Sequence, residues 1–249
     1  MVPRPVHAPS PAARRGPRTI ALVGIDGSGK TTQAHLLADE LAARGLPARY
    51  RRNAGGRHWF GKLALVFGRA DAEALLGRRG MLLVESVLRW LAILRTLLRR
   101  AVTREITVMD RYAVCQYASI RARGGRSERA ARLAYRVFPR PDVTFLLAVD
   151  PANAYERIER RGYDHEEMSY LRAADAAYRS LPEYPAFVII DANGTPDQVR
   201  AALLEHLPAP FPSRSVMSVL VAHARAVLVA VASLAAAATV VTYQLVDGF

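Results

Sequence analysis

Short runs of apolar residues alternate with longer amphipathic stretches along most of the chain. The apolar runs cover residues 19–23, 106–109, 143–149 and 186–190. Their continuity predicts parallel β-strands that are buried on both faces. Residues 31–44, 81–100 and 196–207 instead repeat apolar side chains at helical spacing. This alternation predicts an α/β fold, in which a parallel sheet carries helices on both faces in three α/β/α layers.

The two ends of the chain depart from this alternation. Residues 1–18 hold five prolines, four arginines and no acidic residue, which is typical of a disordered basic tail. After the predicted domain of 19–207, a proline-rich linker covers 208–215 and a C-terminal segment covers 216–249. Residues 226–246 form a run of 21 uncharged residues in that segment. As a helix it is about 31 Å long, enough to cross a hydrocarbon core of about 30 Å.

This C-terminal apolar helix predicts a transmembrane anchor. Arg214, His223 and Arg225 lie on its amino side. The positive-inside tendency therefore predicts a cytoplasmic domain, anchored to the inner face of the cell membrane. The alternative is a helix packed on the domain or in a dimer, because seven of the 21 residues are alanine.

The charged residues and the single cysteine limit the kinds of partner and compartment that we expect for this chain. The chain of 249 residues has a net charge of +13, but only two of its 35 basic residues are lysines, Lys30 and Lys62. Acidic and basic residues interleave without a basic stripe that carries aromatic residues, so we expect no nucleic-acid partner. The single cysteine, Cys115, excludes an internal disulfide and favours a reducing compartment.

A glycine-rich turn follows the first predicted strand. Residues 24–31 read GIDGSGKT, which matches G-x-x-x-x-G-K-[ST] between a strand and a helix. Such a loop binds ATP through backbone amides, with Lys30 on the β- and γ-phosphates and Thr31 as a ligand of Mg²⁺. The predicted nucleotide-binding residues are Gly24, Ile25, Asp26, Gly27, Ser28, Gly29, Lys30, Thr31 and Thr32.

Two charged residues follow the second predicted strand. The carboxylate of Asp110 suits a Mg²⁺ ligand, either directly or through water. Arg111 beside it suits a bidentate contact to a second phosphate.

A basic helix end is a third candidate for phosphate chemistry. Residues 157–162 read RIERRG and run into a polar segment at 164–167. This pattern predicts a lid that closes an arginine over the transferring phosphoryl group, from among Arg157, Arg160 and Arg161. The alternative is a solvated charged helix.

Across residues 19–207 these elements together resemble thymidylate kinase. The resemblance rests on GIDGSGKTTQ at 24–33, RNAGG at 52–56, Arg89, DRY at 110–112, PDVTFLLAVDP at 141–151, RIERRG at 157–162, Tyr178, and VIIDANGTPDQV at 188–199. It implies a P-loop NTPase fold and a homodimer. The implied reaction transfers the γ-phosphoryl group of ATP, with Mg²⁺, to a nucleoside monophosphate, in the first place dTMP.

The same resemblance assigns roles to residues. Lys30 and Asp26 are implied to be catalytic, together with a lid arginine because the P-loop carries none. The implied substrate-binding residues are Arg52 and Arg111 for the acceptor phosphate, and Arg89 and Gln116 for the base.

Several positions depart from the family's usual pattern. The family usually has the motif REPGG where this chain has RNAGG, at 52–56. Glu85 stands where the family usually has a phenylalanine that stacks on thymine. The segment after DRY differs at Cys115, Gln116, Ser119 and Ile120, and the lid reads DHEE at 164–167. Losing a stacking ring removes about 1–3 kcal/mol per base. Two alternatives therefore stay open: a membrane-anchored P-loop kinase with another phosphorylated acceptor, and a non-catalytic ATP-binding module.

Overall fold

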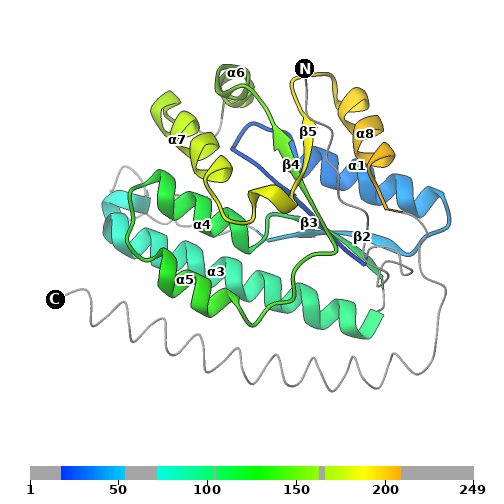
Figure 1. Ribbon diagram of the computed structural model, residues 1–249, viewed down its shortest axis with the longest axis horizontal. Coiled ribbons are helices and arrows are strands. Elements are labelled where there is room, and N and C mark those ends of the chain that lie inside the picture. The colour runs from blue at the N-terminus through cyan, green and yellow to red at the C-terminus, as the bar shows by residue number, and fades with distance from the viewer. Residues whose placement is uncertain (1–17, 54–71, 104, 163–165, 209–249) are drawn as a thin grey trace.

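One parallel sheet forms the centre of the computed structural model, which describes residues 18–53, 72–103, 105–162 and 166–208. Its five described strands are arranged in the order β2-β3-β1-β4-β5 (Figure 1). They are β1 (Thr19–Val23), β2 (Ala48–Arg52), β3 (Ile106–Asp110), β4 (Val143–Ala148) and β5 (Val188–Asp191). Each pairs in parallel with its neighbours, which confirms the predicted sheet.

Helices cover both faces of the sheet. They are α1 (Lys30–Ala43), α3 (Ala72–Thr103), α4 (Ala113–Ala122), α5 (Glu128–Tyr135), α6 (Pro151–Arg161), α7 (Met168–Arg179) and α8 (Pro196–Glu205), with a 3-10 turn at Tyr184–Ala186. In Figure 1, α1 and α8 lie together on one side, and α3, α4 and α5 lie on the other. The fold is therefore the predicted α/β/α arrangement.

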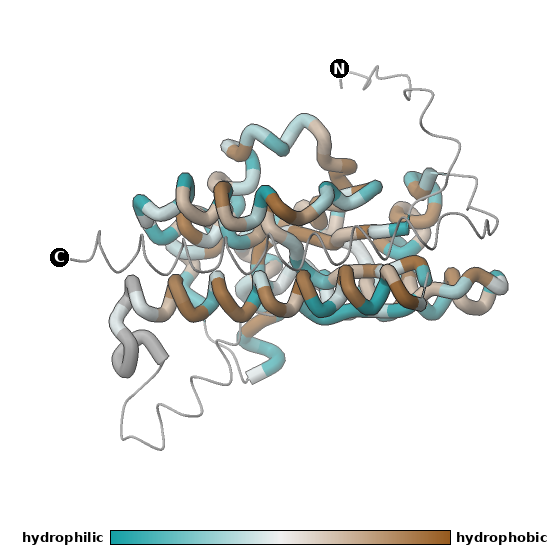
Figure 2. Tube along the Cα trace, turned by 90° about the horizontal axis from the view of Figure 1, so that it is seen from below, coloured by the Kyte–Doolittle hydropathy of each residue, from teal (hydrophilic) through white to brown (hydrophobic). Residues whose placement is uncertain are grey.

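The central strands agree with the apolar runs that predicted them. Every residue of β1 and β3 is buried, as expected for strands covered on both faces. The last strand begins later than its apolar run, at Val188, because Pro185 lies in a 3-10 turn that comes first. In Figure 2, seen from below, hydrophobic and hydrophilic residues alternate along the helices. Helix α4 differs, because its residues 113–120 are all buried.

Strand β2 was not expected from the sequence. Three of its five residues are arginines, so it shows no apolar run. It lies at the edge of the sheet, where Arg49 is exposed and Arg51 pairs with Glu105. Charged side chains on an edge strand discourage pairing with another chain. This explains why β2 lacks the continuous apolar run that predicts a buried strand.

Helix α3 is longer than the predicted helix of 81–100. Gly77 has non-helical angles (φ 70°, ψ 163°), so a break near its start separates two helical parts. The longer part buries Trp90, Ile93 and Leu97 against the core.

Most of the predicted terminal segments lie outside the described residues. These are the basic tail up to residue 17 and everything from 209 onward, including the apolar run of 226–246. Among the helices that are described, none is both long enough and apolar enough to cross a membrane.

We expect Leu37→Ala to lower the free energy of unfolding by about 2–5 kcal/mol, because it leaves a cavity under α1. Leu37 is fully buried, whereas Leu133 on α5 is 54% exposed and provides the matched control. Denaturant unfolding of both variants measures the difference. Equal losses for the two substitutions would contradict the packing described above.

Candidate active site

Two glycines shape the loop between β1 and α1. Gly24 has φ 143° and Gly27 has φ 82°, values that favour glycine. A Cβ atom at Gly24 would lie 2.7 Å from the carbonyl oxygen of Leu147, and one at Gly27 would collide with the carbonyl oxygen of Ala154 in α6. The loop therefore packs closely on the ends of two other elements, and its curvature depends on these glycines.

The amino end of α1 faces this loop. Gly29 is the N-cap in a left-handed conformation (φ 85°) and has no side chain to cap the first N–H groups of the helix. Lys30 is 4% exposed and folds back, with its Nζ 2.5 Å from the carbonyl oxygen of Ile25 and 3.7 Å from Asp26 Oδ1. Unpaired helix N–H groups next to a lysine form a site that suits phosphate.

Strand pairing brings Asp110 to the same place. Leu22 of β1 lies opposite Asp110 of β3, so both strands end beside the loop. The Thr31 hydroxyl donates a 2.6 Å hydrogen bond to Asp110 Oδ2. Asp110 Oδ1 is buried and has no hydrogen-bond partner among the described residues. A buried carboxylate oxygen without a donor, next to a hydroxyl, suits a hard cation such as Mg²⁺.

Asp26 joins the loop to the residue after β3. Arg111 donates to Asp26 Oδ1 at 2.5 Å, and the two side chains are 28% and 31% exposed, so a ligand can reach them. Burial raises the pKa of Asp26, but the charges of Arg111 and Lys30 outweigh it and hold that pKa well below its usual range. Burial and the charge of Arg111 lower the pKa of Lys30. The Asp26 carboxylate raises the pKa of Arg111 well above its usual value.

A second charged cluster lies between α3 and α4. Arg89 is 2% exposed and donates to Glu85 Oε1 at 2.7 Å and to Gln116 Oε1. Burial lowers the pKa of Arg89, but the charge of Glu85 outweighs it and raises the pKa. The Nε of Arg89 is buried and has no hydrogen-bond partner among the described residues.

A small hollow of about 20 Å³ connects the two clusters. Its lining includes Asp26, Arg111, Glu85 and Arg89, together with Cys115 and Ser119 of α4 and Tyr170 and Tyr178 of α7. Burial raises the pKa of Tyr178, as does its neighbour Cys115. The hollow is about the size of one water molecule.

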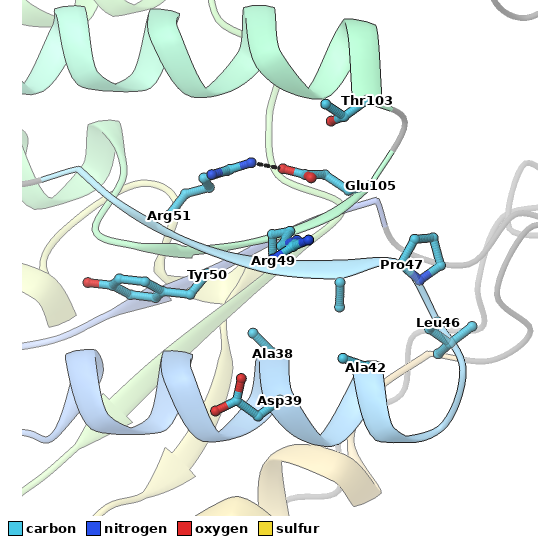
Figure 3. A pocket seen from close by; sticks show the side chains of 11 residues that line it. Ala38, Asp39, Ala42, Leu46, Pro47, Arg49, Tyr50, Arg51, Thr103 and Glu105 are labelled. Atoms are coloured by element: carbon cyan, nitrogen blue, oxygen red, sulfur yellow. Dashed lines mark hydrogen bonds and ion pairs between the residues drawn. The ribbon is translucent and has the colours of Figure 1, made fainter.

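A larger hollow of about 620 Å³ lies elsewhere, along β2 from α1 to the end of α3 near Thr103 (Figure 3). Among its described lining residues are Asp39, Tyr50, Arg51 and Glu105, but none of the predicted site residues. We place the site at the small hollow, because that is where the phosphate loop and the paired charges converge.

Two predicted residues lie at the margin of the site. Arg52 is exposed at the end of β2, and the hollow beside Arg111 does not include it among its described lining residues. Thr32 is exposed in the first turn of α1, next to Thr31. Their assigned roles remain predictions.

The predicted lid arginines lie on α6. Arg157 donates to the carbonyl oxygens of residues 192 and 193 at 2.9 and 3.0 Å, which ties α6 to the loop after β5. Arg160 and Arg161 are exposed at the end of the helix. Residues 163–165, which follow them, lie outside the described part of the chain. Which arginine acts on the phosphoryl group therefore remains a prediction.

A phosphate loop on β1, an acidic residue on β3 and a second arginine–carboxylate pair facing the loop define a P-loop kinase of the nucleoside monophosphate class. The thymidylate kinase family model matches residues 22–203, more than half of the chain. The chain therefore belongs to the thymidylate kinase family.

Curated relatives agree with this assignment. A probable thymidylate kinase of Archaeoglobus fulgidus is 28% identical over 187 residues, which cover 73% of this chain and 90% of that protein. A thymidylate kinase of Jannaschia sp. is 30% identical over 194 residues, 74% of this chain and 92% of that one. A thymidylate kinase of Xanthomonas oryzae pv. oryzae is 32% identical over 188 residues, with coverages of 72% and 78%.

We expect Glu85→Ala to lower the free energy of unfolding by about 3–5 kcal/mol, because it leaves the buried Arg89 charge without its carboxylate. The control is Glu40→Ala, which breaks another pair at the same helical spacing, with Arg44, on the surface. That change costs under about 1 kcal/mol. The double variant Glu85→Leu/Arg89→Met recovers much of the loss. Equal small losses for both single variants, measured by denaturant unfolding, would rule out a buried ion pair.

We expect the stabilisation from the Asp26 carboxylate to disappear in acid. Its folded pKa lies below the ordinary value of 3.8, so the contribution is present above that value and falls as the pH drops through the folded pKa. The difference in unfolding free energy between wild type and Asp26→Asn should shrink as the pH falls from about 7 to about 3. Asp197→Asn, at a side chain 81% exposed, is the control. A difference that grows in acid would contradict the ion pair with Arg111.

Proposed function

We propose that the chain transfers the γ-phosphoryl group of ATP to dTMP, giving dTDP and ADP. One observation carries this proposal: the Asp26 carboxylate contacts both Lys30 of the phosphate loop and Arg111 beyond β3. Two cations thus approach the same carboxylate oxygen, Asp26 Oδ1, and each suits the phosphate of one substrate. Membership of the thymidylate kinase family supports the same reaction.

The residues act by position and charge. An oxygen of the acceptor phosphate attacks the γ-phosphorus of ATP, and the bond from that phosphorus to the β–γ bridging oxygen breaks, so ADP leaves. Lys30 turns from the Ile25 carbonyl to the phosphates of ATP, and Arg111 holds the acceptor phosphate. Asp26 stays ionised at neutral pH and orients both cations. Bringing two anionic groups together is costly in water, and these fixed cations lower that cost.

Mg²⁺ fits this site. The donors are the Thr31 hydroxyl and Asp110, whose buried Oδ1 has no hydrogen-bond partner in the described part of the chain. Within that part, no group of three or more His, Cys, Asp and Glu side chains forms a metal cage. This agrees with a cation held by few protein ligands and by substrate phosphates. When bound, Mg²⁺ supplies positive charge at the phosphate oxygens of ATP.

A second acceptor is the competing proposal. The Glu85 carboxylate lies in the wall of the acceptor hollow, paired with Arg89. A carboxylate in that wall favours a ligand that offers a hydrogen-bond donor, such as the exocyclic amine of a base. A nucleoside monophosphate other than dTMP is therefore the alternative acceptor.

The homodimer and the membrane anchor are further proposals. Leu91 and Val102 of α3 are 48% and 67% exposed, which supports a contact between copies of the chain on this helix. The anchor would be the apolar run of 226–246, outside the described residues, and would place the kinase at the inner face of the cell membrane.

We expect Lys30→Ala to lower kcat/KM at least about 100-fold, because it removes the mobile charge on the ATP phosphates. The assay measures ADP release with dTMP, dUMP, dCMP, dAMP or dGMP, and without acceptor. Arg129→Ala, at an exposed residue of α5, is the charge-matched control and keeps full activity. Faster turnover of another acceptor would replace dTMP by that nucleotide. ATP binding without transfer to any acceptor would contradict the kinase assignment.

A further inference from the structure

Arg111 has an unusual backbone conformation. Its φ of 76° is the only positive value at a non-glycine among the described residues. A side chain with a Cβ is strained in this left-handed region, which persists only where the surroundings enforce it. The strain lies on the residue whose guanidinium pairs with Asp26, at the point where the chain leaves β3.

Hydrogen bonds hold the backbone on both sides of this residue. The N–H of Arg111 donates to the carbonyl oxygen of Leu22 at 3.1 Å. Its carbonyl oxygen accepts a 3.1 Å bond from the side-chain amide Nδ2 of Asn53. The N–H of Asn53 in turn donates to the carbonyl oxygen of Asp110, also at 3.1 Å. Asn53 therefore donates hydrogen bonds to the peptide groups on both sides of the Arg111 Cα.

Thr96 anchors the side-chain amide of Asn53. The Thr96 hydroxyl donates to Asn53 Oδ1 at 3.0 Å, and the two residues are 1% and 0% exposed. Because the Arg111 carbonyl oxygen can only accept, it requires Nδ2, and the Thr96 hydroxyl then donates to Oδ1. The opposite orientation would set two oxygen atoms against each other. The amide has one orientation that satisfies both neighbours.

Helix α3 thus reaches the site at two places. Thr96 follows Arg89 by seven residues and Glu85 by eleven, which places all three on one side of the helix. Glu85 and Arg89 line the acceptor hollow, whereas Thr96 acts on Arg111 through Asn53. One helix therefore connects the part of the site beside Arg89 with the part beside Arg111.

We propose that Asn53 and Thr96 are positioning residues for phosphoryl transfer. They hold Arg111 in its left-handed conformation, so that its guanidinium stays on Asp26 and faces the acceptor phosphate. This inference rests on the proposed function, in which Arg111 binds that phosphate. Neither residue contacts the substrate itself, and their effect falls on binding of the acceptor rather than of ATP.

The test compares Thr96→Val with wild type. Valine keeps the shape of threonine but removes the hydroxyl that anchors Asn53. We expect the KM for the acceptor to rise about tenfold, while kcat and the KM for ATP stay within about twofold, since the lost contact serves the ground state and the transition state alike. Asn53→Asp, which loses the donor to Arg111, gives the same pattern. Thr96→Ser keeps the hydroxyl and restores the wild-type KM.

Thr103→Val is the matched control. It lies on the last turn of α3, is exposed, and donates only to the Arg99 carbonyl among the described groups. We expect its kinetics to equal those of wild type. An unchanged acceptor KM in Thr96→Val and Asn53→Asp would overturn the inference. So would a uniform fall in kcat together with a rise in both KM values, because that indicates general damage.

A second readout does not depend on the acceptor. In a crystal structure of Thr96→Val we expect Asn53 Nδ2 to move away from the Arg111 carbonyl oxygen and the φ of Arg111 to leave the left-handed region. A φ that stays near its value in wild type would overturn the inference. If wild type phosphorylates no acceptor in the panel, the proposed function fails, and this readout still decides whether the two residues hold Arg111.

Discussion

The pairing of β1 with β3 is the constraint on which the site depends. Its register sets Leu22 opposite Asp110, so the phosphate loop and the Asp110–Arg111 step leave the sheet side by side. That placement lets Thr31 reach Asp110 and lets Asp26 reach Arg111. A shift of one residue would turn the buried side chains of both strands to the opposite faces, so the packed core on each face holds the register.

Two charged clusters at the described site occur as pairs with opposite sign. Asp26 is shared by two cations, and Arg89 is matched by Glu85. A buried charge without a partner costs several kcal/mol, so each pair tolerates little change at either member. The arrangement also has a functional consequence. Arg111 is already held in place before a substrate arrives, which reduces the reorganisation that the reaction requires, whereas Lys30 turns from the Ile25 carbonyl oxygen.

The sequence predicted the parts of the molecule that depend on local pattern. Continuous apolar runs predicted β1, β3 and β4, and the spacing of glycines and Lys30 predicted the phosphate loop. Features that depend on distant contacts were not predictable. Strand β2 is rich in arginine because it lies at an edge. Asn53 attracted notice only as a departure from a motif, since its contact with Thr96 joins residues 43 positions apart. The lid arginines are adjacent and chemically alike, so no pattern distinguishes them.

A crystal structure with a non-hydrolysable ATP analogue, Mg²⁺ and dTMP tests the central claim most directly. The claim is that Lys30 and Arg111, joined by Asp26, hold the phosphates of two different substrates. We expect the γ-phosphate beside Lys30, the phosphate of dTMP within hydrogen-bond distance of the Arg111 guanidinium, and the cation at Thr31. A dTMP phosphate bound away from Arg111, or both phosphates contributed by one nucleotide, would contradict the account.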